Sequence, residues 1–244
     1  MQWLIARYQP TSLFSLKHGD ATSTGGKSLL VPTPFAVRMA LLDAAIRTEG
    51  VPAGPGAFEQ IKSLRLAMRP PEHAAVASIF VKVLKPEREA EARGREMSQT
   101  IAFREYVHLA GELMLAFGAD ADTLTAIAPW LVQVSYFGKR GSFYQLLEPP
   151  RSLATDGEGP PAGFVNLSGP DLTREAHSGP FPLGIIQRLD EWGDSLTYAK
   201  ANIYNREARA KIKAGEDRVR MDVILPYRLV RSSRGYTLYQ CFEP

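Results

Sequence analysis

The clearest amphipathic pattern in the chain predicts a helix from residue 34 to about residue 46. Thr33 is a residue type that caps helices, and Pro34 is favoured in the first turn because its missing N–H needs no partner there. One apolar stripe runs along the helix, with Arg38 one residue off it, and comprises Val37, Ala40, Leu41 and Ala44. A basic, glycine-containing loop precedes the helix, and such a loop is suited to holding a phosphodiester backbone.

Alternation of apolar and polar positions predicts strands over residues 2–8 and 77–84, and a strand pair or bent strand over 101–117. A second short helix is predicted from Phe58 and Ile61 and includes Leu64 and Leu66. Asp120 caps a further helix, in which Pro129 forces a kink or a restart. Residues 218–227 alternate cleanly and, with a turn at 232–235, predict a C-terminal β-hairpin with one basic face.

The order strand, helix, strand, insertion, strand, helix, strand is typical of a split βαβ, or ferredoxin-like, arrangement. We therefore predict an α+β class, with a ferredoxin-like (RRM-like) domain over residues 1–148 and a smaller β-rich region over 149–244. The insertion, from Pro86 to Thr100, is strongly charged. Because its charges nearly balance, its own sequence favours a solvated hairpin or disordered loop over a finger that reaches a partner. Residues 148–182 are rich in Pro, Gly and Ser and predict an irregular connection.

The composition is that of an ordinary globular protein, with 45% hydrophobic and 23% charged residues among 244. No run approaches the roughly 18 apolar residues of a membrane span, and the chain opens on a strand-like pattern rather than a signal peptide. Cys241 is the single cysteine, which excludes an internal disulfide and a cysteine-cluster metal site. We therefore expect a cytoplasmic protein with no metal and no cofactor.

The net charge of +3 is weak evidence for a nucleic-acid partner. Its distribution is more informative, because nine Lys and Arg stand against four acids between residues 206 and 234. Such a region is the expected footprint of a polyanion partner, and a solvated basic face explains it equally well.

Two further segments contain glycine beside basic residues. Gly26-Lys27-Ser28 is not a nucleotide-binding P-loop, since position 21 is Ala21 and two prolines, Pro32 and Pro34, prevent a helix from continuing after Ser28. In residues 136–144, two glycines bracket Lys139-Arg140 and aromatic residues flank both sides. This second segment offers amides, charge and stacking to a phosphate and its base, or is simply a tight basic turn.

Three segments resemble the Cas-five subunit of type I Cascade surveillance complexes, in the CRISPR-associated RAMP superfamily. Residues 31–41 (VPTPFAVRMAL) are similar to the family's proline-proline segment at its first helix. Residues 103–106 (FREY) are similar to the segment after the family's thumb. Residues 136–142 (YFGKRGS) are similar to its glycine turn after the second helix. The resemblance covers most of residues 1–148 and, more loosely, the final hairpin.

This resemblance implies a RAMP domain with an inserted thumb hairpin at about residues 86–100, which helps to hold the five-prime handle of a guide RNA. It implies a non-catalytic subunit that contributes to antiviral DNA surveillance. The implied partners are the guide RNA (crRNA), Cas-seven backbone subunits and a large Cas-eight-type subunit. Target DNA near its flanking motif is a further candidate, and no membrane is implied. The residues expected to bind RNA are Lys17, His18, Lys27, Arg38, Arg88, Arg93, Arg95, Arg104, Tyr136, Lys139 and Arg140.

One Cas-five branch cleaves precursor RNA with a tyrosine, a lysine and a histidine, so a metal-independent endoribonuclease is the alternative. Cleavage needs a base for the 2′-hydroxyl and positive charge at the scissile phosphate. The candidates are His18 beside Lys17, and His108 beside Tyr106. Binding without cleavage is favoured, because no Lys-His pair follows the thumb strands where that branch would need it. A third hypothesis is an assembly module whose basic hairpin contacts a protein.

Overall fold

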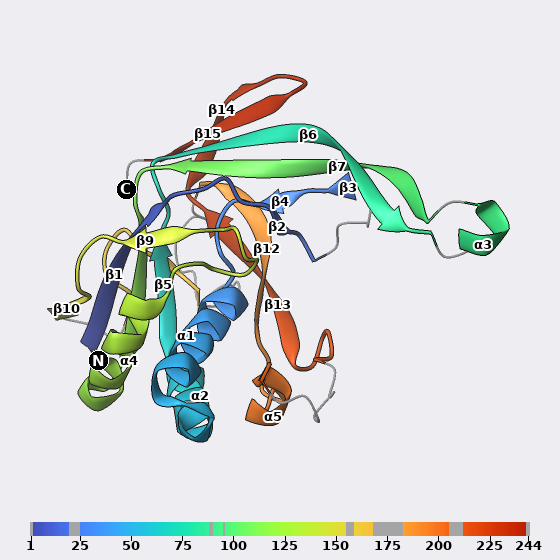
Figure 1. Ribbon diagram of the computed structural model, residues 1–244. Coiled ribbons are helices and arrows are strands. Elements are labelled where there is room, and N and C mark those ends of the chain that lie inside the picture. The colour runs from blue at the N-terminus through green and yellow to red at the C-terminus, as the bar shows by residue number, and fades with distance from the viewer. Residues whose placement is uncertain are drawn as a thin grey trace.

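The structure is a computed structural model that describes residues 2–19, 25–87, 90–94, 96–154, 159–167, 183–204 and 212–242. It is a mixed α/β fold in which strands predominate and helices are few (Figure 1). None of the described helices is both long and apolar enough to span a lipid bilayer.

The first sheet is built around β1 (Gln2–Pro10), which pairs with β8 (Leu113–Ala119) on one side. Its other edge pairs with β10 (Arg151–Ala154) and β9 (Tyr144–Leu146). Beyond β8 lie β5 (Arg65–Arg69) and β11 (Val165–Asn166), so that the order is β10-β1-β8-β5-β11. All these pairs are antiparallel.

Three helices gather on one side of this sheet (Figure 1): α1 (Pro34–Glu49), α2 (Gly54–Ser63), which follows the 3-10 turn η1 (Val51–Ala53), and α4 (Ala121–Gln133). Both predicted caps are confirmed: the side chains of Thr33 and Asp120 accept hydrogen bonds from the backbone N–H three residues ahead. Most of the predicted stripe of α1 is buried, and Ala40 is half-buried. Helix α4 continues through Pro129 without a restart.

The second sheet has the order β14-β15-β6-β7-β3. Its centre is a long hairpin of β6 (His73–Pro86) and β7 (Met97–Ala110). Flanking strands are β14 (Tyr227–Ser232), β15 (Tyr236–Cys241) and the short β3 (Gly25–Gly26), which runs parallel to β7. The far half of the hairpin, residues 79–87 and 96–104 with α3 (Ala90–Arg93) near its tip, projects away from the body of the molecule (Figure 1), and we call it the arm.

Two smaller hairpins complete the described fold. Strands β12 (Ile185–Trp192) and β13 (Arg218–Leu225) pair along their whole length, and β12 packs against α1. Strands β2 (Leu16–Lys17) and β4 (Ser28–Leu29) pair with each other, and β4 contacts β7. The last helix, α5 (Tyr198–Ala201), lies in the connection from β12 to β13, where the Lys200 ammonium lies 2.7 Å from the fully buried carboxylate of Asp217.

Three sequence predictions need correction. Leu64 and Leu66 do not extend the second helix, because the chain becomes extended at Leu64 and residues 65–69 form β5 in the first sheet. Residues 218–225 are a strand as predicted, yet they pair with β12 rather than with the C-terminal strand. The C-terminal hairpin consists of β14 and β15 instead, because Pro226 ends the ladder of β13 before Tyr227.

Candidate nucleic-acid interface

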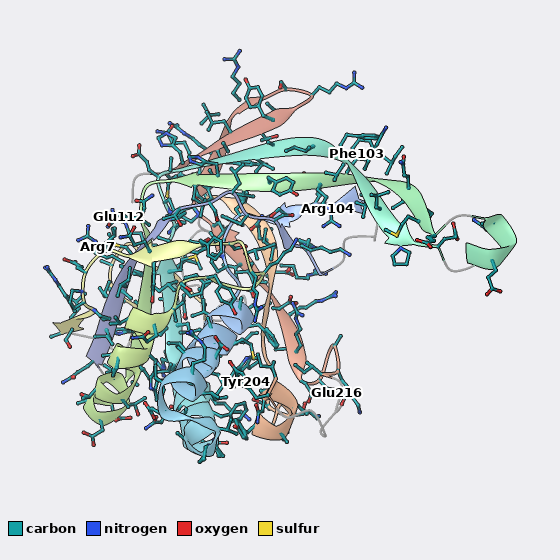
Figure 2. The ribbon with its side chains drawn as sticks, viewed as in Figure 1. Arg7, Phe103, Arg104, Glu112, Tyr204 and Glu216 are labelled. Atoms are coloured by element: carbon teal, nitrogen blue, oxygen red, sulfur yellow. The ribbon has the colours of Figure 1, made fainter. Side chains whose placement is uncertain are left out.

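A groove of about 480 Å³ lies where α1 meets the β2–β4 hairpin, the edge of β7, the turn after α4 and the β12–β13 hairpin. It contains four residues that the sequence predicted at an RNA interface, which are far apart in the chain: Lys17, Arg104, Tyr136 and Lys139. Figure 2 shows Arg104 below β7, on the side toward β4. The fold therefore assembles one basic and aromatic site from elements that the sequence could not place together.

The cations of this groove are available to an anion. Lys17 and Lys139 are exposed and Arg104 is half-buried. Within the described part of the chain, none of these three side chains makes a hydrogen bond or ion pair. Three unpaired cations around one concave surface raise the local concentration of anions and favour a phosphodiester backbone.

The acids that line the same groove are neutralised by partners of their own. Asp190 is 4% exposed, and its carboxylate accepts a hydrogen bond from Arg218 and lies 3.9 Å from the Arg220 guanidinium. Asp43 accepts hydrogen bonds from Arg47 at 2.8 Å and from the Tyr204 hydroxyl at 2.7 Å. The bond to Asp43 raises the pKa of the Tyr204 hydroxyl.

Arg218 and Phe35 form part of the groove wall that sequence reasoning missed. The Arg218 guanidinium lies 4.7 Å from the centre of the Phe35 ring, within the range of a cation–π contact. Phe35 follows the first proline of α1, and Arg218 belongs to the basic region that the sequence left open between a partner and a solvated face. A signal for Arg218 existed in the alternation of residues 218–225, which places it opposite the buried Val223 and Leu225.

The turn after α4 presents Lys139 because its neighbour Phe137 anchors it in the core. Phe137 is 1% exposed and packs edge-on against Tyr8 and Tyr144, with ring centres 5.2 and 5.0 Å apart. Gly138 has a φ of 74°, which glycine adopts without strain. The amide of Ser142 then closes the turn by donating to the carbonyl of Lys139 at 3.0 Å.

Replacing Gly138 by alanine is expected to destabilise the protein by about 1–2 kcal/mol, because the positive φ is unfavourable for a residue with a Cβ. The added Cβ would also lie 2.9 Å from a methyl group of Leu16, which itself lines the groove. Chemical denaturation measures the effect. The matched control is Gly56→Ala in α2, where nothing lies within 4 Å, and it is expected to be neutral or to stabilise by up to about 1 kcal/mol. Equal effects of the two substitutions would contradict this account.

The other predicted residues lie elsewhere. His18 and Lys27 line a separate pocket of about 270 Å³, together with Glu105 and Tyr239. Arg140 is exposed on the turn but outside the groove lining. Arg93 lies in α3 on the arm, 3.6 Å from the carboxylate of Glu87. Arg88 and Arg95 lie outside the described residues.

Arg38 is a correction, since the structure places it in the interior. Only 5% of Arg38 is exposed, and its guanidinium binds both carboxylate oxygens of Glu191 at 2.9 and 3.1 Å. It also donates to the backbone carbonyls of Ile61 and Leu64. Arg38 lies one residue off the apolar stripe, and this position predicted a side chain that faces solvent. In the structure, β12 covers that side of α1.

The groove can bind and orient a polyanion with unpaired bases, since it combines three cations with the ring of Tyr136. The histidine of this region, His18, lines the other pocket rather than the groove. Within the described ranges, no three His, Cys, Asp or Glu side chains gather in a way that could hold a metal ion.

No family model matches the chain. A sequence relative is the CRISPR-associated protein Cas5 of Archaeoglobus fulgidus, which is 30% identical over 159 residues that cover 62% of this chain and 68% of the relative. A crystal structure of a CRISPR protein from Archaeoglobus fulgidus aligns over 100% of this chain and 93% of its own, at 10% identity and a TM-score of 0.40. A chain of a CRISPR RNA-guided surveillance complex aligns over 78% and 76%, at 15% identity and a TM-score of 0.34.

Proposed function

We propose that this chain, which belongs to the Cas5 family of CRISPR-associated proteins, is a non-catalytic guide-RNA-binding subunit of a type I effector complex. The observation that carries this proposal is the groove, in which Lys17, Arg104 and Lys139 meet beside Tyr136. The three cations would contact successive phosphates of the five-prime handle, and the tyrosine would stack on one of its bases.

The arm is proposed to act as the thumb of a ferredoxin-like RAMP domain. It projects from the body as a two-stranded hairpin (Figure 1) and carries Arg104 at its base. An isolated two-stranded hairpin is marginally stable in water, which favours a role in which the arm packs against RNA or a neighbouring subunit. The proposed partners are Cas-seven backbone subunits and a large Cas-eight-type subunit, with target DNA nearby, in the cytoplasm.

Replacing Lys17, Arg104 and Lys139 together by alanine is expected to weaken binding of repeat-derived RNA on the order of a hundredfold, because three charge-assisted contacts are lost. The slope of log affinity against log salt should flatten by about 2, at about 0.7 for each phosphate of a single strand. Fluorescence anisotropy over a salt series measures both quantities.

The matched control removes three exposed cations outside the groove, Arg69, Arg151 and Lys213, and changes the net charge by the same amount. Its slope should stay close to that of the wild type. Equal losses in the two triple variants would mean that general charge, and not the groove, attracts the RNA. A wild-type protein with no affinity for repeat RNA would contradict the proposed function itself.

The second candidate function is a metal-independent endoribonuclease, and one observation favours it. His18, Lys27 and Tyr239 line a common pocket, which provides a candidate base, a cation for the phosphate and a hydroxyl. Labelled precursor RNA incubated in EDTA and resolved on a denaturing gel separates the two functions. Intact RNA supports binding alone, whereas cleavage that His18→Ala abolishes would establish the nuclease.

A further inference from the structure

The strands β14, β15, β6 and β7 present one face to the core and one to solvent. Core-side residues of β6 and β7 are 7% exposed or less: Ala74, Val76, Val107 and Leu109. The residues that alternate with them are half-buried or exposed: His73, Ala75 and Ala77 on β6, and Tyr106 and His108 on β7. None of the helices in Figure 1 lies over these strands. We call this solvent-facing side of the four strands the open face.

Two tyrosines stand in one row across the open face, because directly opposed residues of antiparallel strands point to the same side. Tyr236 of β15 opposes Ala77 of β6, which in turn opposes Tyr106 of β7. Their Cα atoms therefore lie about 10 Å apart, across two strand spacings, and only the methyl side chain of Ala77 stands between them in this row. Tyr236 is 38% exposed and Tyr106 is half-buried. Each ring can accept a stacked base.

A β-bulge in β14 brings two arginines to this same face. The register between β14 and β15 shifts between Leu229 and Arg231, so Val230 is an extra residue. Arg228 opposes Gln240 and Arg231 opposes Leu238, two positions on one side of β15. In an unbroken strand, residues three apart point to opposite faces. The bulge therefore turns Arg231 to the same face as Arg228, and β-bulges are known to redirect side chains in this way.

The open face carries cations and aromatic rings without any acid among the residues that the four described strands place on it. Its cationic edge is Arg228 and Arg231, both exposed. An acid occurs just before β6, where the Glu72 carboxylate lies 3.7 Å from the His73 ring. Solvated protein surfaces ordinarily interleave charges of both signs. An acid-free face with stacking rings is complementary to a single-stranded nucleic acid.

The open face is continuous with the groove through Arg104. Arg104 of β7 opposes Ile79 of β6. This pair lies two residues along each strand from the pair of Tyr106 and Ala77, so both pairs belong to the same face. Arg104 also lines the groove. A strand held in the groove thus leaves it directly onto the row of tyrosines.

We propose that the open face is a stacking platform for the stretch of guide RNA that leaves the groove. Bases stack on Tyr106 and Tyr236, while phosphates approach Arg228 and Arg231 at the edge of the sheet. This inference rests on the proposed function of the groove, and it adds a second, separable contact to the same RNA strand. Unpaired bases are required, because a base within a duplex has no free face for stacking.

The test measures the affinity of fluorescent oligoribonucleotides from about 4 to about 16 nucleotides, the range of single-strand site sizes. Wild-type affinity is expected to rise with length once the RNA extends beyond the groove. Tyr106→Ala and Tyr236→Ala should each remove about five- to a hundredfold of that gain and leave the shortest RNA unaffected. Tyr106→Phe and Tyr236→Phe keep the rings and should retain the gain. Arg228→Ala with Arg231→Ala should flatten the salt slope for long RNA by about 1.4.

The outcomes separate the platform from the groove. If the alanine variants keep the full length-dependent gain, or if the wild type binds short and long RNA equally, the platform is overturned while the groove stands. If RNA of no length binds the wild type, both proposals fall. A length-dependent gain that single-stranded DNA shows and RNA lacks would also overturn the platform. Thermal melting of each variant excludes unfolding as the cause of a lost gain.

Discussion

Replacing Arg38 by alanine is expected to destabilise the protein by about 3–5 kcal/mol, since it leaves a largely buried carboxylate without its partner. The side chains of Arg38 and Glu191 are only 6% and 13% exposed, and the guanidinium meets both carboxylate oxygens. The same guanidinium satisfies the carbonyls of Ile61 and Leu64 at the end of α2. One side chain thus joins α1, α2 and β12. Urea denaturation of the single variant measures the loss.

The control for Arg38 removes both charges at once. Arg38→Met with Glu191→Leu should be less destabilising than Arg38→Ala, because no charge is left unpaired. It should not reach wild-type stability, since the two carbonyls still lack a donor. A cost of less than about 1 kcal/mol for Arg38→Ala is typical of an exposed pair and would contradict the buried bridge. If Arg38→Ala lowered the affinity for RNA without changing the free energy of unfolding, Arg38 would belong to the RNA interface after all.

Replacing Trp192 by alanine is expected to cost about 3–5 kcal/mol, the usual range for deleting a large buried aromatic side chain. Trp192 is 7% exposed and stacks on Phe58 of α2, with ring centres 4.7 Å apart and an interplanar angle of 19°. This contact holds the end of β12 against the helical layer. Because β12 also carries Asp190 of the groove wall, loosening it should weaken RNA binding as well.

Trp192→Phe is the matched variant for this prediction. It keeps a ring against Phe58 and removes the indole Nε1–H, which is buried and has no hydrogen-bond partner among the described residues. Removing this unsatisfied buried donor offsets part of the free-energy cost of the lost side-chain volume. We therefore expect Trp192→Phe to destabilise the protein by less than about 1.5 kcal/mol. Guanidinium denaturation compares the two variants. Equal costs would show that the stack contributes little.

The helices and most strands could be predicted because their signals are local. Thr33 and Asp120 cap helices through hydrogen bonds to residues three positions ahead. The alternation of apolar and polar residues along β13 distinguishes its more buried side from its exposed side. Strand pairing is not local. Nothing in residues 218–225 distinguishes β12 from β15 as their partner, so the predicted C-terminal hairpin was wrong in its first strand.

The sequence predicted the basic and aromatic character of the candidate site, but only some of the residues that form it. Lys17, Tyr136 and Lys139 were identified as basic or aromatic residues near glycine, and Arg104 through the resemblance of residues 103–106 to the segment after the family's thumb. The fold brings all four to one groove. Arg38 was misassigned because the helical stripe reports burial against one layer, and β12 forms a second layer. Arg218 was missed as an individual residue because its role depends on the ring of Phe35, which is distant in sequence.

The position of β1 inside its sheet, with partners on both edges, has a consequence for how the chain folds during synthesis. Its partners β8, β9 and β10 all come from residues 113–154, so β1 leaves the ribosome well before the strands that pair with it. From Pro10 to Ala154 the ribosome adds 144 residues (154 − 10), which takes about 7–30 seconds. The β6–β7 hairpin closes within microseconds of its own synthesis. Until β8 arrives, both edges of β1 are unpaired, and an unpaired strand edge is a template for aggregation.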